Sequence, residues 1–446
     1  MHKTVLFLSL VFSFFIGASQ PQVMWQVWLD GTIDRWGYSW GDEFSGDSVD
    51  NSKWLDSYPW GRNYSGTCYQ EYMTPGQNYE LENGILKLTA KRGHIFAKGV
   101  HYKSDSAVLS DGKPNLREWN YTSGMLYSKE LFKHGMFEIR CKLPAGTGFW
   151  PAFWLFAGKP NEEIDIFEFV GKDPKRLHFD IHCPENCKKF GGDIFINTDF
   201  SAHFNTVMGQ WDEDIVYWHL NGESFAFWKG SMQHAAALIA NLGVANNKPC
   251  PFWPAPDETT PFPAYFQIDH IRVWNRIDDD FAIEIPDYST TGVDPDALRA
   301  RLTKFIEKSS AVSWNINELF EEQSPDFQDN TLNATYGHPL ITEGSMFYNK
   351  KGKLKNRRKQ PVNNPSQLSV RIFAYPETSR IVLEFEGKIN APITIALQDL
   401  HKNIIFSATD IVENKVEIDL SSLSKGSYLL RGEFGEKNVT ERINLL

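Results

Sequence analysis

The sequence predicts an all-β protein whose main part is a β-sandwich. Residues 36–275 consist of short apolar or alternating runs separated by Gly, Pro, Asn and Asp, which is typical of strands and turns. Helical periodicity is almost absent from this region. In addition, Asn221-Gly222 directly follows the strand-like run 215–220, and Asn-Gly favours a two-residue hairpin turn. Strand-like runs return after residue 369, so a second, small β-sandwich is expected there.

The expected strands fall into these two regions. They include 84–90, 136–143 and 215–220 in the first region, and 380–385, 393–397, 403–406, 416–420 and 427–431 in the second. Between the regions the composition becomes polar, and 295–308 is the one helix we expect. Asp294 is a good N-cap for it, Pro295 suits its first position, and apolar residues recur on one side.

The beginning of the chain has the composition of a secretory signal peptide. Residues 1–19 combine Lys3, an apolar run too short to span a bilayer, and small residues before Gln20. We therefore divide the chain into a signal peptide (1–19), a main domain (20–276), a linker (277–368) and the small sandwich (369–446). The protein is expected to be secreted, either extracellular or at the cell surface, with no membrane span. We also expect it to be a monomer.

Charge and cysteine content narrow the function further. A net charge of −11 disfavours nucleic acid as a partner. Of the five cysteines, Cys183 and Cys187 flank a tight turn and are the expected disulfide pair, and the odd number leaves at least one thiol unpaired. The alternative to this disulfide is a zinc site made of the same two cysteines with His178 and His182, although this spacing fits no strong zinc template.

Three carboxylates in one strand-like run stand out from the rest of the sequence. In Glu163-Ile164-Asp165-Ile166-Phe167-Glu168 they are interspersed with large apolar residues. Buried charge is costly unless it is used or paired. In a regular strand Glu163 and Asp165 share a face and Glu168 points away. A β-bulge between Asp165 and Glu168 adds one residue and turns all three to one face. The alternative is an edge strand whose acids face water.

The flanking runs favour a sugar-binding cleft. Upstream, Trp150 and Trp154 share one face of an aromatic strand, and downstream His178, Asp180 and His182 share one face of another. Flat aromatic side chains stack well on sugar rings, although each Trp has an equally plain interpretation as a core residue.

At these residues the chain resembles glycoside hydrolase family 16. The acidic run matches the longer, bulged form of the family's Glu-x-Asp-x-x-Glu signature. The surrounding blocks occur in the family's order, namely Asp42-Glu43-Phe44, 121–124, Gly135 to Arg140, Trp211 with 215–222, and 263–274. The resemblance covers roughly residues 38–276 and concerns the fold and the reaction more than the sugar.

The resemblance implies a concanavalin-A-like jelly roll of two antiparallel sheets and an endo-acting hydrolase that retains anomeric configuration. It implies Glu163 as nucleophile, Glu168 as general acid and then base, and Asp165 as the residue that orients the nucleophile. Negative charge on Glu163 and Asp165 is expected to raise the pKa of Glu168. The expected substrate-binding residues are Trp150, Trp154 and Trp211, stacking on sugars, and His182, contacting the ring or Glu168.

No cofactor is required for this reaction, and no metal is assigned to the catalytic residues. A structural calcium ion occurs in the family, but no oxygen-ligand motif in this sequence identifies its site. A β-linked polysaccharide is the expected partner.

Blocks around 150–154 and 256–263 favour a β-1,3-glucan of the laminarin type. The loop 157–162 lacks the Trp-Pro pair common in laminarinases, and 243–247 departs from a usual Gly-Gly pair. Marine galactans such as agar, porphyran or carrageenan, and a catalytically silent sugar-binding protein, are the alternatives.

The last region resembles the C-terminal sorting domain of the type IX secretion route, mainly through 418–430. That resemblance implies outer-membrane secretion machinery as a partner. A carbohydrate-binding module is the competing interpretation, and the absence of Trp from this region disfavours it. The basic run 350–359 is interpreted as a solvated linker, with docking to an anionic surface as the alternative.

Overall fold

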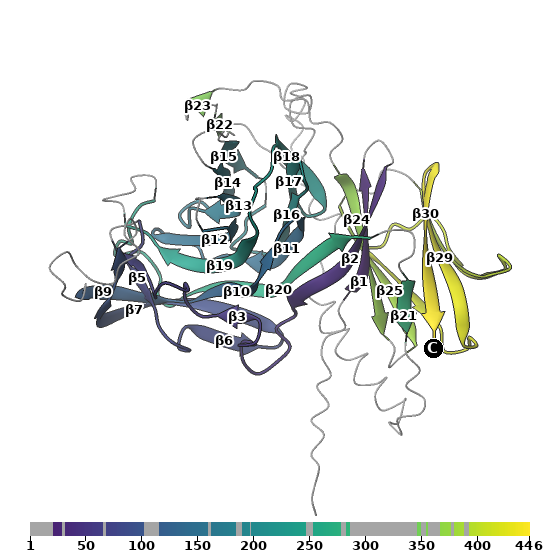
Figure 1. The fold of residues 1–446 in the computed structure, drawn as a ribbon, viewed down its shortest axis with the longest axis horizontal. Helices are drawn as coiled ribbons and strands as arrows, with labels where there is room; N and C mark the ends of the chain where they lie inside the picture. Colours follow the sequence, from purple (N-terminus) through teal and green to yellow (C-terminus); the bar gives the residue numbers. More distant parts are fainter. Residues whose placement is uncertain are drawn as a thin grey trace, which may run out of the picture.

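The structure, a computed structural model, describes residues 21–28, 32–65, 68–101, 116–158, 162–183, 190–196, 198–246, 253–277, 282–285, 346–348, 354–355, 366–375, 379–387 and 392–446 (Figure 1). The expected signal peptide, the expected helix and most of the basic run lie outside these residues. Every regular element within them is a β-strand, which confirms the all-β prediction. No helix in the described part of the chain is long and apolar enough to cross a membrane.

Fourteen strands form the largest sheet, here called the outer sheet. Its main path is β18 (Glu223–Lys229), β17 (Ile215–Leu220), β16 (Asn205–Trp211), β11 (Gly135–Lys142), β20 (Ala264–Arg276), β2 (Ile33–Asp42), β1 (Pro21–Trp28), β24 (Ser366–Tyr375), β25 (Arg380–Gly387) and β28 (Lys415–Asp419). Strand β7 (Ile85–Lys98) pairs with β20 and, in turn, with β6 (Tyr79–Glu82) and β9 (Leu116–Ser123), and β5 (Glu71–Met73) pairs with β9.

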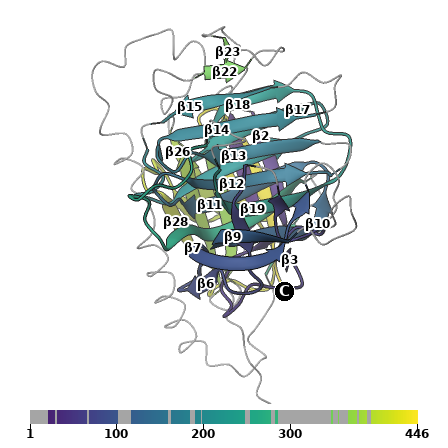
Figure 2. The ribbon, with the colours of Figure 1, turned by 90° about the vertical axis from the view of Figure 1, so that its left-hand side faces the viewer.

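Nine strands form a second sheet, here called the acid sheet because its strand β13 carries the three carboxylates. Figure 2 shows its central strands one above another. Its order is β23 (Leu354–Lys355), β22 (Met346–Tyr348), β15 (Phe190–Phe195), β14 (Arg176–His182), β13 (Glu163–Phe169), β12 (Phe149–Phe156), β19 (Ala236–Val244), β10 (Met125–Phe132) and β3 (Trp54–Leu55). A short pair, β4 (Tyr64–Ser65) and β8 (Val100–His101), lies apart from both sheets.

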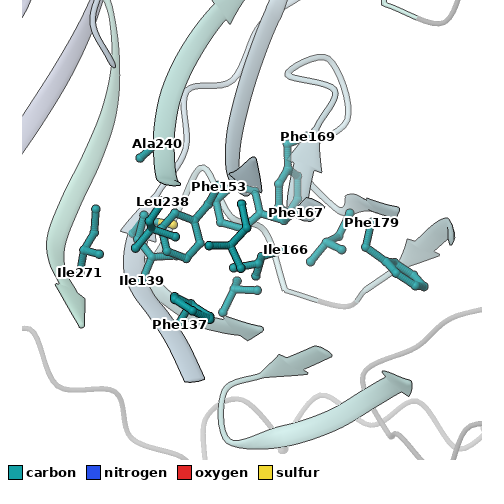
Figure 3. Close-up of a cluster of buried hydrophobic side chains, with 14 of the residues drawn as sticks. Phe137, Ile139, Phe153, Ile166, Phe167, Phe169, Phe179, Leu238, Ala240 and Ile271 are labelled. Carbon is teal, nitrogen blue, oxygen red and sulfur yellow. The ribbon is translucent and has the colours of Figure 1, made fainter. Parts of the chain in front are cut away.

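The main hydrophobic core lies between these two sheets. Phe137, Ile139 and Ile271 come from the outer sheet, and Phe153 and Leu238 from the acid sheet (Figure 3). All of them are excluded from water. The inner face of each sheet is thus apolar, and the opposite face of the acid sheet is left for polar side chains.

The bulge predicted in the acidic strand is present. Asp165 pairs with Asp180 on β14, but Glu168 pairs with His178, so β13 contains one residue more than its neighbour between these pairs. The pairing with β12 shifts at the same place. Both intervening residues, Ile166 and Phe167, are fully buried in the core (Figure 3). A bulge of this kind lets the flanking carboxylates share the opposite face.

The outer sheet accommodates the bulge in two ways. The indole Nε1 of Trp218 on β17 donates a hydrogen bond to the backbone carbonyl of Asp165 at 2.9 Å, which satisfies a polar group buried in the core. On β16, Gly209 leaves room for Ile166, because a Cβ at this position would lie 2.6 Å from Ile166 Cγ1. Any larger residue at 209 would therefore press on the bulge.

At the other end of the molecule the outer sheet continues into a second sandwich. Strands β1, β24, β25 and β28 face a five-stranded sheet of β21 (Ala282–Ile285), β30 (Lys437–Leu445), β29 (Gly426–Phe434), β26 (Ile393–Asp399) and β27 (Ile404–Ala408). Strand β1 pairs with β2 on one side and with β24 on the other (Figure 1). The division of the chain at residues 276 and 369 stays a prediction, and β1 has partners on both sides of it.

We predict that Gly209→Ala destabilises the fold by about 1–3 kcal/mol, because the added methyl overpacks the core against the bulged residue Ile166. Denaturant unfolding of both proteins measures this difference. Gly46→Ala is the matched control, since a Cβ there meets its nearest atom, Ser48 O, only at 3.6 Å. Equal losses in the two variants would contradict the close fit at Gly209.

Candidate active site

The three carboxylates of β13 lie together on the face of the acid sheet that points away from the core. Their side chains are largely shielded, with 20% of Glu163, 3% of Asp165 and 14% of Glu168 exposed. Desolvation and close approach of like charges both favour the protonated form of a carboxyl group. The cluster therefore needs either protons or positively charged neighbours.

His182 on β14 supplies one such neighbour. Its Nε2 lies 3.2 Å from Asp165 Oδ2 and 3.9 Å from Glu163 Oε1. Asp180 lies on the same face of β14 as His182, and its Oδ2 is 3.7 Å from His182 Nε2. His182 was expected to contact the sugar ring or Glu168, but the shortest of these distances is to the middle acid, Asp165.

A separate group of side chains holds Glu168. The indole Nε1 of Trp150 donates a hydrogen bond to Glu168 Oε1 at 2.8 Å, and His178 Nε2 lies 3.8 Å from Oε2. His178 Nδ1 is 3.1 Å from Asp193 Oδ1 on β15, and the guanidinium of Arg176 donates two hydrogen bonds to the same carboxylate. Asp193 and Arg176 therefore fix the orientation of the imidazole that faces Glu168.

The pKa of Glu168 is raised, and burial is the main cause. His178, His182 and the hydrogen bond from Trp150 oppose this rise, while Asp180 adds to it. The direction agrees with the expectation from sequence, but the dominant cause is desolvation rather than the charge of Glu163 and Asp165. A raised pKa keeps a carboxyl group protonated near neutral pH, as a general acid requires.

Burial also raises the pKa of Glu163 and of Asp165 well above their ordinary values. For Glu163 the neighbouring Asp165 adds to the rise and His182 opposes it. For Asp165 the charges of Glu168 and Asp180 add to the rise. Since the acids favour one another's protonation, His182 is the group whose charge favours an ionised Glu163.

The predicted tryptophans occupy three different environments. Trp150 is stacked between Tyr69 and Trp253, with ring centroids 4.7 and 4.4 Å away and nearly parallel planes. Both faces of its indole are therefore covered by protein, and its contact with the site is the hydrogen bond to Glu168. Tyr69 and Trp253 were not predicted, because each comes from a loop with no periodic pattern.

Trp154 lies on the acid sheet opposite Asp165 and donates a hydrogen bond to Asn241 Oδ1 at 2.8 Å. Its ring packs in a cluster with Tyr58, Tyr127 and neighbouring apolar residues and is 8% exposed. Trp211 lies on β16 of the outer sheet and is fully buried in the core, where its indole Nε1 donates a hydrogen bond to Ser231 Oγ. A sugar cannot stack on Trp211 in this position, so the structure does not support its predicted role.

The same cluster also contains side chains that could bind a metal ion. Among the described residues, one group of histidine and carboxylate side chains is close enough to hold an ion, and it consists of Glu163, Asp165 and His182, with ligand atoms within 4.8 Å of one another. These are the candidate catalytic residues themselves. The zinc alternative loses one thiolate ligand, because Cys183 is disulfide-bonded, as is Cys68. Cys141 is a free, buried thiol.

The calcium site of the family stays a prediction. Two acids in the family's sequence blocks are paired with cations: Glu43 with Arg272, and Asp269 with Arg140. These pairs leave little unbalanced negative charge for a divalent ion at those residues.

Glu71 on β5 connects the segment carrying Tyr69 to the end of β19. Its carboxylate accepts hydrogen bonds from the backbone N–H of Val244 at 2.9 Å and of Gln70 at 3.1 Å. The side chain is buried, and burial raises its pKa to about 8. Between its ordinary pKa and this value the folded protein binds a proton more tightly than the unfolded chain, so the stabilising contribution is complete at low pH and is lost as the pH rises toward 8.

We predict that Glu71→Gln removes this loss. Between pH 5 and 8 the free energy of unfolding of the wild type should fall relative to that of the variant, by at most about 1.4 kcal/mol per pH unit. Urea unfolding at several pH values measures the difference. Glu82→Gln serves as the control, because Glu82 is exposed and its pKa is lowered by Lys87. Parallel pH profiles of wild type and Glu71→Gln would contradict the raised pKa.

Two family models match parts of this chain. Residues 71–264 match the family model of glycosyl hydrolases family 16, and residues 371–445 match the model of the secretion system C-terminal sorting domain. A glucan endo-1,3-β-glucosidase of Cryptopygus antarcticus is 29% identical over 240 residues, which are 48% of this chain and 82% of that protein.

A second relative is the glucan endo-1,3-β-glucosidase A1 of Niallia circulans, 27% identical over 275 residues, 53% of this chain and 37% of that protein. Among solved structures, the endo-β-1,3-glucanase from Pyrococcus furiosus is 28% identical, with a TM-score of 0.48 over 58% of this chain and 99% of that one. The chain is thus a secreted glycoside hydrolase that is similar to glycosyl hydrolases family 16 at 71–264 and to the secretion system C-terminal sorting domain at 371–445.

Proposed function

We propose that this protein is a retaining endo-β-1,3-glucanase that cleaves laminarin-type polysaccharides outside the cell. The observation that carries the proposal is the bulged strand, which brings Glu163, Asp165 and Glu168 to one face with different partners for the two glutamates. The substrate class comes from the relatives, since those named above are glucan endo-1,3-β-glucosidases. We further propose that the protein acts as a monomer.

In the proposed mechanism Glu163 attacks the anomeric carbon while Glu168 donates its proton to the departing glycosidic oxygen. The products of this step are a covalent glycosyl-enzyme and a shortened glucan with a new hydroxyl group. Glu168, now ionised, then takes a proton from water as that water attacks the anomeric carbon and releases Glu163. Two displacements restore the original configuration, which requires carboxyl groups about 5–5.5 Å apart.

The surroundings of each glutamate suit these roles. Glu163 must be an anion when it attacks, and His182 is the neighbour that favours its charged form. Asp165, hydrogen-bonded to Glu163 and 3.2 Å from His182 Nε2, orients the nucleophile. Glu168 alternates between acid and base. After proton transfer, its ionised state is stabilised by the charge of His178 and by the hydrogen bond from the indole N–H of Trp150.

We predict reducing-end release from laminarin by the mature protein, with much less from agarose, porphyran or carrageenan. Polysaccharide length should fall early in the reaction, as internal cleavage requires. Activity on a galactan alone would replace the proposed substrate. Binding of laminarin without any release of reducing ends would favour the sugar-binding alternative.

A second assay, azide rescue of two variants, separates the roles of the glutamates. On an activated β-glycoside, Glu163→Ala with added azide should give the α-glycosyl azide, because the small anion replaces the nucleophile. Glu168→Ala with azide should give the β-glycosyl azide, because the anion attacks the intact glycosyl-enzyme. The opposite assignment of products would exchange the two roles.

We predict that Trp150→Phe shifts the basic limb of the kcat/KM profile to higher pH by about 1 unit. Loss of the indole N–H removes a hydrogen bond that favours the ionised form of Glu168, so the pKa of the general acid rises. The aromatic ring between Tyr69 and Trp253 is kept.

Trp119→Phe is the control, because Trp119 donates its hydrogen bond to Ala97 O at 3.3 Å within the β7–β9 strand pair. A lower rate with an unchanged limb in Trp150→Phe would indicate that Trp150 only supports the fold.

A further inference from the structure

Strand β1 belongs to two parts of the molecule at once. Its residues pair with β2 on one edge, for example Trp25 with Arg35, and with β24 of the sorting domain on the other, Trp25 with Val370. Strand β24 belongs to the region matched by the sorting-domain model, whereas β1 begins only two residues after the expected signal peptide. The first described strand and the strands β24, β25 and β28 of the C-terminal region therefore share one sheet (Figure 1).

Side chains of β1 complete the core of the C-terminal sandwich. Val23, Trp25 and Val27 are buried in the same cluster as residues of β24, β26 and β29. Trp25 lies directly against Gly432 of β29, where an added Cβ would be 2.5 Å from the indole. Its Nε1 donates to Glu441 Oε1 at 2.8 Å, and Arg35 makes two further hydrogen bonds of 2.6 Å to the same carboxylate. Glu441 is fully buried.

A second buried contact joins the sorting domain to strand β11 of the hydrolase domain. Arg371 of β24 points its guanidinium at Glu138 of β11, with Nε 3.1 and 3.2 Å from the two carboxylate oxygens. His270 Nε2 lies 2.8 Å from the same carboxylate, and Trp274 donates to it at 3.0 Å. Glu138 is fully buried and Arg371 is 6% exposed. Removing one partner of such a pair leaves the other charged, buried and unpaired.

Neither contact depends on the connecting segment between the two matched regions. β1, Arg35 and Glu138 lie before residue 277, and Arg371, Gly432 and Glu441 lie after residue 365. Sheet pairing, a shared apolar core and two buried ionic contacts are together the features of a permanent interface rather than of a loosely linked tail.

We propose that the sorting domain is a composite unit, made of 366–446 together with the N-terminal strand 21–28 and strand β21, and that it remains bound to the hydrolase domain when the connecting segment is cut. This inference rests on the sorting-domain match and the interface, and it holds whichever polysaccharide the enzyme cleaves. Its consequence is that a cut in the connecting segment does not by itself release the enzyme from whatever holds the sorting domain.

The test uses the full mature chain with a specific protease site inserted after Gln360. After complete cleavage, the two pieces are passed through a size-exclusion column at micromolar concentration without denaturant. We expect the pieces to elute together at the volume of the uncut protein and to separate only in denaturant. Separate elution of a folded hydrolase piece under native conditions would overturn the proposal.

Two interface variants and one control locate the contacts. Trp25→Ala and Arg371→Met are each expected to weaken retention after cleavage, by ~100-fold or more in the dissociation constant. Arg380→Met removes an exposed pair with Glu417 within the same sandwich and should leave retention unchanged. Near-ultraviolet circular dichroism of each uncut variant checks that it is folded. If both folded interface variants retained the sorting domain as well as the wild type does, other contacts would hold it, and the composite unit would be contradicted.

Discussion

Burying three carboxylates on one face of a strand whose other face builds the core is the constraint that organises the hydrolase domain. Regular alternation would send Glu168 into the core, so β13 contains one additional residue. That residue places Ile166 and Phe167 side by side in the core, which in turn requires a glycine at 209 on the facing sheet. The carbonyl of Asp165 loses its regular environment and is satisfied by Trp218. The geometry of the proposed catalytic residues thus depends on core residues of the opposite sheet.

Electrostatics follow from the same constraint. Burial raises the pKa of each acid, so cationic and hydrogen-bonding partners decide which of them ionises first. His182 stands beside Asp165 and Glu163, while His178, held by Asp193 and Arg176, stands beside Glu168. Each glutamate therefore has its own imidazole, and proposed nucleophile and proposed acid differ in partners rather than in degree of burial.

Local patterns in the sequence were sufficient to predict that the three acids share one face of a bulged strand, and to predict many of the other strands. The period of two residues along a strand implied the bulge, and the expected runs at 380–385, 393–397 and 427–431 lie within observed strands. The tryptophans could not be placed in this way, because stacking depends on residues distant in sequence. Trp150 is covered by Trp253, about a hundred positions later, and the burial of Trp211 depends on which sheet β16 joins.

Long-range pairing also explains why β1 was not assigned to the C-terminal sandwich. Its apolar residues need a partner, but the sequence does not identify which of many strands supplies it, and here the partner is some 340 positions away. The buried ion pairs reduce this ambiguity in the folded protein. A sheet edge accepts many strands, whereas a buried Glu441 facing Trp25 and Arg35, and a buried Glu138 facing Arg371, are satisfied by one register alone. In a protein with this many strands, such contacts penalise incorrect pairings, because every alternative leaves a charge buried without its partner.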